Sequence, residues 1–405
     1  MWAAMKTQKR RRRDAGSGSG SGPGPGSEPA AEPAAEAEAA KPAKPFDVIL
    51  GWGGSGKSVR GFRHAAKYKR VGFLGLTAAL LDSVPEEMQS RLAFKMTVAA
   101  FVARPQLDLQ KDTCLYIDEI SMVPPLLLDE VLRRARACAV ICTGDVYQIP
   151  PILPDNAEKR WFFEADEYAR RNPKVVVVEE QHRLAGKECA DVRALLEAVA
   201  YQHRASTPKN AWKEAMATFV ERRRLPQAPP GATIIVFTND QIKALTRKWA
   251  AEHKLTLDRH GLCKGMPVSI TANAFKVATA EKVEYAYRNG QRGVLAAINE
   301  TSVAVRLDAT GKNVTVQNGG AGKIVPMVKS AIAQTVDAAQ GKTIKEHVHV
   351  IVPKRYTPEP ARLLVAFSRA KSTSVQINDA AVFAQGCQEA QFDKRAVLYA
   401  ANYTL

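Results

Sequence analysis

The stretch VILGWGGSGKS at residues 48–58 decides the fold. Its first residues, Val48–Leu50, are apolar and predict a short buried strand, and the glycines that follow let backbone N–H groups curl around phosphate oxygens. Lys57 and Ser58 then open a helix whose positive end faces the same phosphates. The match to GxxxxGK(S/T) between a strand and a helix predicts a P-loop. The nucleotide-binding residues expected in it are Gly51, Gly53, Gly54, Ser55, Gly56, Lys57 and Ser58.

Two acidic residues stand where a P-loop needs a metal ligand and a base. The apolar run Leu115–Ile117 ends in Asp118 and Glu119. We expect Lys57 to reach the β- and γ-phosphates and Ser58 to bind Mg²⁺, which Asp118 would hold through its water shell. Glu119 would accept the proton of the attacking water. Taken alone, an apolar strand that ends in two acids is also an ordinary strand–helix junction.

A polar turn follows the next apolar strand, Val140–Thr143. Gly144 and Asp145 are a turn signal, and Gln148 carries an amide that can sense a γ-phosphate or a water. Taken singly, the segment is more typical of a Gly-Asp turn than of a site. Both interpretations stay open at this point.

Short apolar runs alternate with amphipathic stretches in the first half of the chain, which predicts an α/β fold with a parallel sheet. The strands expected there are Val48–Leu50, Val71–Leu76, Leu115–Ile117, Val140–Thr143 and Val175–Val178. A hinge rich in Pro and Gly follows at residues 226–231. The first domain is therefore expected at 46–228.

A second α/β domain is expected at 229–405, because Thr233–Thr238 and Val348–Val352 again have the composition of buried strands. Between these two runs, residues 262–330 hold short β segments and an Asn-Gly turn signal. This pattern predicts a small β-barrel inserted into the second domain.

The 405-residue chain is strongly basic, with 58 Lys and Arg against 41 Asp and Glu and a formal net charge of +17. Such a field attracts polyanions, and RNA or DNA is the default partner; the alternative is that the excess cations only keep the protein soluble. Residues 1–45 predict a disordered tail, because Gly/Ser and Glu/Pro/Ala repeats cannot bury apolar surface. Its basic run consists of Lys9, Arg10, Arg11, Arg12 and Arg13.

Several classes of protein are disfavoured. No apolar run reaches the ~18 residues that a membrane-spanning helix needs, and the N-terminal segment lacks the apolar core of a secretory signal. The six cysteines are scattered without CxxC pairs, which favours a reducing compartment and argues against zinc.

Six motifs stand in the order found in superfamily 1 helicases. They are the P-loop, Ile117–Glu119, Gly144–Gln148, Gln181–Arg183, Thr335–Gly341 and Val365–Ala370. More narrowly, residues 46–405 resemble the helicases of positive-strand RNA plant viruses. A helicase with a basic N-terminal extension is similar to the first protein of the triple gene block, the movement helicase, in its benyvirus-like form.

The resemblance implies two RecA-like P-loop domains and an SH3-like barrel at 262–330. It also implies that Arg183 and Arg369 approach the γ-phosphate from the domain interface as arginine fingers. Gln340 and Gly341 match the motif that links nucleotide state to the grip on the strand. The alternative for the arginines is a surface salt bridge.

Two threonines, Thr77 and Thr335, match positions that touch the nucleic-acid backbone, and helix capping is their alternative. Two departures from the family pattern are visible. Ser368 stands where many relatives have Thr, and only the disordered tail precedes Phe46. The upstream glutamine segment that reads adenine is thus not expected here, which implies weak selectivity among nucleotides.

These observations predict an enzyme, an NTPase and RNA helicase that couples hydrolysis of ATP or another NTP, with Mg²⁺, to translocation on RNA. It would bind single-stranded viral RNA and support cell-to-cell movement of a plant virus. Small viral membrane proteins of the same gene block are the expected protein partners, and the host cytoplasm, with plasmodesmata or the nucleolus, is the expected location.

Two other functions compete with this one. The first is a replication helicase for viral RNA or cellular DNA. The second is a non-enzymatic RNA-coating protein, which is disfavoured because the catalytic set is intact. That set consists of Lys57, Asp118, Glu119, Gln148 and Arg369.

Overall fold

The computed structural model describes most of the chain beyond its N-terminal tail. The described ranges are 44–107, 109–151, 153–154, 157–200, 211–278, 283–319, 326–353 and 359–377. The basic run Lys9–Arg13 lies outside them, so the expected tail stays a prediction. Within these ranges, no helix combines the length and the apolar character needed to cross a bilayer.

A six-stranded parallel sheet carries the P-loop. In spatial order its strands are β3 (Leu92–Thr97), β2 (Arg70–Gly75), β4 (Thr113–Ile117), β5 (Ala139–Gly144), β1 (Phe46–Gly51) and β6 (Lys174–Val178). Every neighbouring pair is parallel. The α/β fold with a parallel sheet is therefore confirmed, and five of its strands were predicted; β3 was missed.

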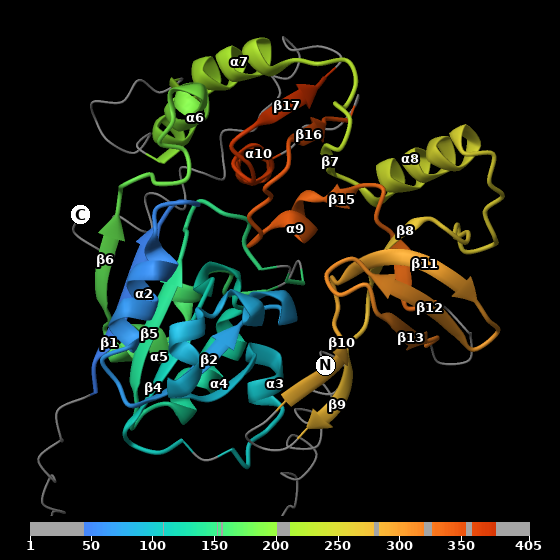
Figure 1. The fold of residues 1–405 in the computed structure, drawn as a ribbon. Coiled ribbons are helices and arrows are strands. Elements are labelled where there is room, and N and C mark those ends of the chain that lie inside the picture. The colour runs from blue at the N-terminus through green and yellow to red at the C-terminus, as the bar shows by residue number, and fades with distance from the viewer. Residues whose placement is uncertain are drawn as a thin grey trace, which may run out of the picture. The chain divides into compact units, whose positions relative to one another are not determined.

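Helices cover both faces of this sheet (Figure 1). Helix α2 (Lys57–Ala65) packs on one face, where Ile49 of β1 points. The other face, where Val48 and Leu50 point, is covered by three further helices. These are α3 (Val98–Val102), α4 (Pro125–Arg134) and α5 (Asp166–Arg171). Because successive residues of a strand point to opposite faces, an apolar run such as Val48–Leu50 fits only a sheet that is buried on both sides.

A second parallel sheet follows in the chain. Its order is β15 (Gln334–Thr335), β7 (Thr233–Val236), β16 (Val348–Ile351) and β17 (Thr373–Gln376). The α-helices described after residue 189 are α6 (Ala190–Ala200), α7 (Ala211–Arg223), α8 (Asn239–Glu252), α9 (Val336–Ala339) and α10 (Pro360–Phe367). The two runs that the sequence indicated are its central strands β7 and β16. The domain boundary at 228/229 stays a prediction.

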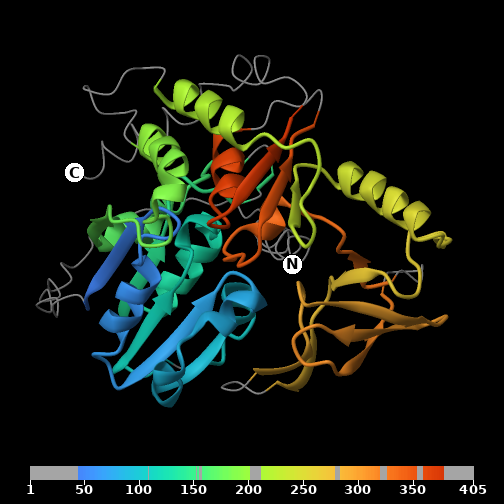
Figure 2. The same ribbon diagram turned by 45° about the horizontal axis from the view of Figure 1, so that its top comes forward.

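Antiparallel strands fill the region between α8 and β15. One sheet has the order β13 (Asn313–Gln317), β12 (Ser302–Leu307), β11 (Arg292–Ile298), β8 (Pro267–Ile270) and β14 (Val328–Ser330). A separate hairpin pairs β9 (Ala274–Ala278) with β10 (Val283–Tyr287). Figure 2 shows the strands of the larger sheet, in orange, gathered into one curved layer. The β insertion thus lies where the sequence indicated, and its SH3-like character stays a prediction.

Short 3₁₀ helices complete the described structure. They are η1 (Ala78–Ser83), η2 (Glu86–Arg91), η3 (Ile120–Met122), η4 (Phe162–Glu164) and η5 (Lys187–Cys189). Of these, η1 and η3 follow the carboxyl ends of β2 and β4, which is the edge of a parallel sheet where ligands usually bind.

Candidate functional site

The P-loop lies between β1 and α2, and its glycines are required by geometry. Gly54 and Gly56 have φ of 93° and 79°, in the left-handed region that favours glycine. At Gly51 an added Cβ would lie 2.5 Å from Ser55 Oγ. At Gly53 an added Cβ would lie 3.1 Å from an Nη atom of Arg369. The loop therefore stays narrow only with glycine at these positions.

The first carboxylate after β4 forms a hydrogen-bonded cluster with two hydroxyls. Ser58 Oγ donates to Asp118 Oδ1 at 3.3 Å, and Thr143 Oγ1 donates to the same oxygen at 2.5 Å. Burial, and then the charge of Glu119, raise the pKa of Asp118 to about 6, while the positive charge of Lys57 opposes this shift. A hydroxyl and a carboxylate oxygen side by side are ligands of the kind that Mg²⁺ accepts, so Ser58 and Asp118 fit the predicted metal site.

Glu119 has the geometry of a strained and unsatisfied acid. Its φ is 56°, unusual for a residue with a side chain, and it is 7% exposed. One of its carboxylate oxygens is buried without a hydrogen-bond partner in the described structure. A buried acceptor without a partner costs about 1–3 kcal/mol, so a water held there would be stabilising. This fits the predicted role of a base that orients a water.

The loop after β6 clamps the P-loop backbone. Gln181 Nε2 donates to the Gly53 carbonyl at 3.2 Å, and the His182 amide donates to the Gly54 carbonyl at 3.0 Å. Trp52 Nε1 donates back to a carbonyl of the same loop at 2.9 Å. These bonds bring the next residue, Arg183, over the phosphate loop, where an added Cβ on Gly54 would lie 2.6 Å from Arg183 Cβ.

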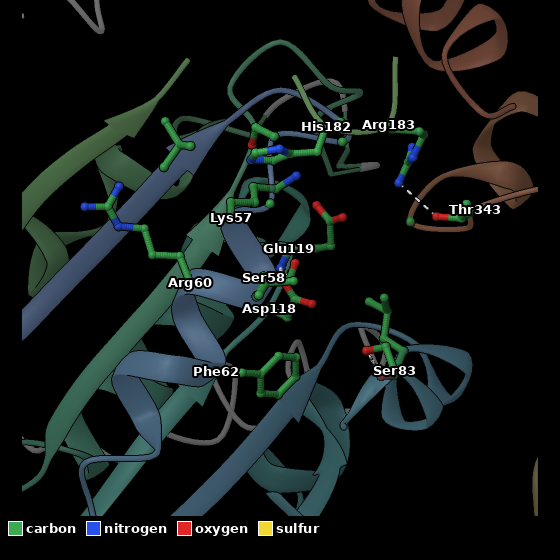
Figure 3. Close-up of a pocket in the computed structure, with 18 of the residues that line it drawn as sticks. Lys57, Ser58, Arg60, Phe62, Ser83, Asp118, Glu119, His182, Arg183 and Thr343 are labelled. Atoms are coloured by element: carbon green, nitrogen blue, oxygen red, sulfur yellow. Dashed lines mark hydrogen bonds between the residues drawn. The ribbon is translucent and has the colours of Figure 1, made fainter. Parts of the chain in front are cut away.

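Two arginines reach the phosphate loop from different parts of the chain. Arg183 donates to Thr343 Oγ1 at 2.8 Å and to the Ser368 carbonyl at 3.3 Å (Figure 3). Arg369 donates to the Val365 carbonyl at 2.9 Å and to Ser368 Oγ at 3.2 Å. Arg369 is 3% exposed.

The electrostatic environment of both guanidinium groups favours binding of an anion. Burial, and then the charge of Arg183, lower the pKa of Arg369 to about 10. Burial also lowers the pKa of Arg183. Among the described residues, neither arginine forms an ion pair with a carboxylate, so the alternative of a surface salt bridge does not apply. The negative charge of Glu119 opposes the lowering of the pKa at both arginines, and that of Asp145 does so at Arg369, but burial outweighs these attractions. A buried cation of this kind is stabilised when an anion binds beside it.

One cavity of about 940 Å³ joins these groups. Lys57, Asp118 and Glu119 lie on one side of it, and Arg183 reaches it beside Thr343 (Figure 3). Gln148 and Arg369 also line it. Ligand sites usually measure about 300–1,000 Å³, so a nucleoside triphosphate fits this cavity.

Gln148 is part of a turn and of the cavity at once. Its Nε2 donates to Asp145 Oδ2 at 3.1 Å, and Asp145 also accepts from the Tyr147 amide at 2.9 Å. Gln340, at the end of α9, donates to Gln148 Oε1 at 3.2 Å and to the Ile149 carbonyl at 3.1 Å. Both interpretations of the Gly-Asp segment are therefore compatible with the structure. The contact between Gln148 and Gln340 is a finding of the structure that the sequence did not indicate.

Thr77 and Thr335 line a second groove, of about 790 Å³. Gly341, which has a φ of 75°, lines both this groove and the nucleotide cavity. Thr335 Oγ1 accepts from the Ala338 amide at 3.3 Å, so it caps α9. Thr77 stands before η1 without a side-chain capping bond and is exposed. The capping alternative thus describes Thr335 and not Thr77.

Sequence reasoning missed two hydroxyls of the phosphate site. Thr143, the residue before the last of β5, donates a hydrogen bond to Asp118, and Thr343 accepts one from Arg183. For Thr143 a signal existed, because β4 and β5 are parallel neighbours whose carboxyl ends meet at one edge of the sheet. For Thr343 no local pattern pointed to the contact.

A P-loop at the carboxyl edge of a parallel sheet, faced by paired acids, is an arrangement typical of P-loop nucleoside triphosphatases. The comparisons with known proteins narrow this class. Residues 47–177 match the family model of the viral superfamily 1 RNA helicase core domain. No curated protein matches the sequence of the chain.

Solved structures with a similar fold include Pif1 helicases. The Bacteroides Pif1 helicase in complex with ADP-AlF3 and single-stranded DNA is 19% identical, with a TM-score of 0.60 over 89% of this chain and 95% of that one. The Candida albicans Pif1 helicase is 16% identical, with a TM-score of 0.56 over 88% and 96%. A structure of two coordinating Pif1 helicases at forked double-stranded DNA is 18% identical, with a TM-score of 0.61 over 88% of this chain and 94% of that one. At these identities the likeness shows the fold.

Proposed function

We propose that this chain is an NTPase that moves along single-stranded nucleic acid, with single-stranded viral RNA as its working substrate. The observation that carries the proposal is the convergence of Arg183 and Arg369 on the P-loop, opposite the paired acids. Arginines without carboxylate partners, beside a P-loop lysine, fit the triphosphate of a nucleotide and the charge that develops during its hydrolysis.

Six polar residues that line the cavity have roles in this reaction. Ser58 and Asp118 would hold Mg²⁺, which would neutralise phosphate charge when bound. Lys57 binds the same phosphates, and Glu119 takes the proton of the attacking water. Arg183 and Arg369 bind the γ-phosphate most strongly when it carries the charge of the transition state.

A short helix would couple hydrolysis to the strand. Helix α9 begins after Thr335, which lines the groove, and ends at Gln340, which hydrogen-bonds to Gln148 in the nucleotide cavity. A shift of Gln148 on loss of the γ-phosphate would therefore move α9 and change the grip on the strand.

The role in cell-to-cell movement of a plant RNA virus is the finer part of the proposal. It is supported by the match of residues 47–177 to a viral RNA helicase core and by the net charge of +17. In this role the chain would work in the host cytoplasm, at plasmodesmata or in the nucleolus. Small viral membrane proteins of the same gene block would be its partners.

A replication helicase is the second candidate, and a specific observation favours it. The Bacteroides Pif1 helicase of similar fold was crystallised with single-stranded DNA. A chain with this function would act on DNA or on replicating RNA, with the same NTP cavity.

The first experiment measures NTP hydrolysis by the purified full chain with Mg²⁺. Single-stranded RNA and single-stranded DNA of one sequence are compared as activators. Stronger stimulation by RNA supports the proposal, and stronger stimulation by DNA supports the replication helicase. Hydrolysis that neither polymer stimulates, together with no binding of either, would overturn both.

A second experiment separates movement from replication. A viral genome that encodes Lys57→Ala is introduced into single host cells and into intact tissue. The movement role requires normal accumulation in single cells and no spread between cells in tissue. Loss of accumulation in single cells would instead indicate replication.

A further inference from the structure

Three polar residues form a row across neighbouring strands of the β insertion. Ser269 of β8 pairs with Arg292 of β11 on one side and with Lys329 of β14 on the other. Directly paired residues of antiparallel strands project from the same face, with Cβ atoms about 4.5–5.5 Å apart. The row therefore presents cation, hydroxyl and cation side by side.

The sequence alternation of these strands places the row on the open face. Val268 and Val328, next to Ser269 and Lys329, are buried in the core of the insertion. Arg292 and Lys329 are exposed. Because neighbouring residues of a strand point to opposite faces, the row faces away from the apolar core.

The row lines the groove of about 790 Å³ that also contains Thr77 and Thr335. A third cation, Lys342, joins it there from the segment after α9. Among the described residues, Asp337 is the one acid that lines the groove, and it accepts two hydrogen bonds from Arg362, at 2.8 and 2.9 Å.

The three cations of the groove lack counter-ions in the described part of the chain. Among the described residues, no ion pair with a carboxylate is formed by Arg292, Lys329 or Lys342. One Nη of Arg292 donates to the Ala331 carbonyl at 2.9 Å, and this bond leaves the positive charge of the guanidinium without a counter-ion. Burial, and then the charges of Arg292 and Lys329, lower the pKa of Lys342. Like charges that repel one another in a groove are stabilised by a bound anion.

We infer that Arg292, Ser269 and Lys329, with Lys342, form a phosphodiester-binding site for the backbone of a single nucleic-acid strand. The guanidinium fork of Arg292 binds two oxygens of one phosphate, and Ser269 donates a further hydrogen bond. Lys329 and Lys342 act as point charges on the same or the next phosphate. The site rests on the proposed function and adds the β insertion to the surface that holds the strand.

The inference is tested with the full chain carrying Arg292→Gln and Lys329→Gln together. The matched control is Arg306→Gln, an exposed cation of the same sheet on β12 that does not line the groove. Fluorescence anisotropy of labelled single-stranded RNA, and of DNA of the same sequence, is measured over a series of salt concentrations. Thermal unfolding of each variant checks that it is folded.

Each lost phosphate contact on a single strand lowers the slope of log affinity against log salt by about 0.7. The double variant should therefore lose about 1.4 from the slope and on the order of 10-fold in affinity at moderate salt. The control should bind as the wild type does. Lys329→Gln alone should lose about half of the slope change, and it serves as the test if the double variant does not fold.

Two results would overturn the inference while leaving the proposed function intact. The first is a wild type that binds the strand and a double variant that binds it with the same affinity and the same salt slope. The second is a control that loses as much as the double variant, since bulk charge would then account for the effect. A wild type that binds neither polymer would overturn the inference and the proposed function together.

Discussion

Replacing Arg369 with methionine should leave the protein stable and nearly inactive. Burial lowers the pKa of Arg369 from its ordinary range to about 10. At 1.36 kcal/mol per unit, this shift opposes the charged form in the folded state by about 3 kcal/mol. Because the pKa is lowered on folding, this destabilisation is fully present below about pH 10 and is lost as the pH rises above that value toward the ordinary pKa of an arginine.

The same substitution also removes stabilising contacts. Arg369 donates two hydrogen bonds, to the Val365 carbonyl and to Ser368 Oγ, each contributing about 1 kcal/mol. The methionine side chain keeps most of the apolar packing. The free energy of unfolding of the nucleotide-free protein should therefore rise by about 1 kcal/mol at neutral pH.

Turnover should respond in the opposite direction. An arginine that stabilises the transition state of phosphoryl transfer contributes about 10³–10⁵ in kcat, or roughly 4–7 kcal/mol. Nucleotide affinity should fall far less, because the group acts mainly on the transition state. Arg369→Lys should restore little, since an ammonium cannot reproduce the planar fork.

The assay compares denaturant unfolding, nucleotide binding and turnover of Arg369→Met with those of Arg133→Met. Arg133 is a suitable control because its pair with Glu130 is a partly exposed contact within α4. The control should change stability by less than about 1 kcal/mol and leave turnover unchanged. Loss of more than about 2 kcal/mol of stability in Arg369→Met, or a parallel fall of affinity and turnover, would refute the reasoning.

Four further predictions concern other parts of the chain. Lys57→Ala, or chelation of Mg²⁺, should abolish hydrolysis in a steady-state assay without unfolding the protein. Gln340→Ala should remove stimulation of hydrolysis by RNA, because the link to the nucleotide cavity is cut; a wild-type ratio of stimulated to unstimulated turnover would contradict this. Deleting residues 1–45 should weaken RNA binding and flatten its salt dependence, whereas an unchanged slope would assign binding to the folded part alone. Arg288, which bridges to Asp82 at 2.5 Å, should show a coupling below about 1 kcal/mol in a double-mutant cycle of unfolding, because Asp82 is largely exposed.

Local patterns predicted the phosphate site because its chemistry is local. The P-loop glycines and Asp118 each follow an apolar strand directly, and Lys57 opens the helix after the P-loop. Parallel strands bring their carboxyl ends to one edge. Strand β3 was missed because LAFKMT mixes apolar and polar residues at the edge of the sheet. The clamp of Gln181 on Gly53 joins residues far apart in the chain, and no local pattern encodes such a contact.

The cationic row of the β insertion shows where prediction from one sequence stops. The alternation within each strand was visible, because Val268 and Val328 are apolar and the residues beside them are polar. The sequence did not indicate which strands pair with each other or in which register, because register depends on tertiary contacts. A slip of one residue would place Arg292 or Lys329 in the apolar core. Burial of the core therefore fixes the register of the strands. The register in turn places the cations side by side. The packing that stabilises the insertion is therefore also what assembles its anion site, and apolar substitutions in its core should disperse that charge as well as lower stability.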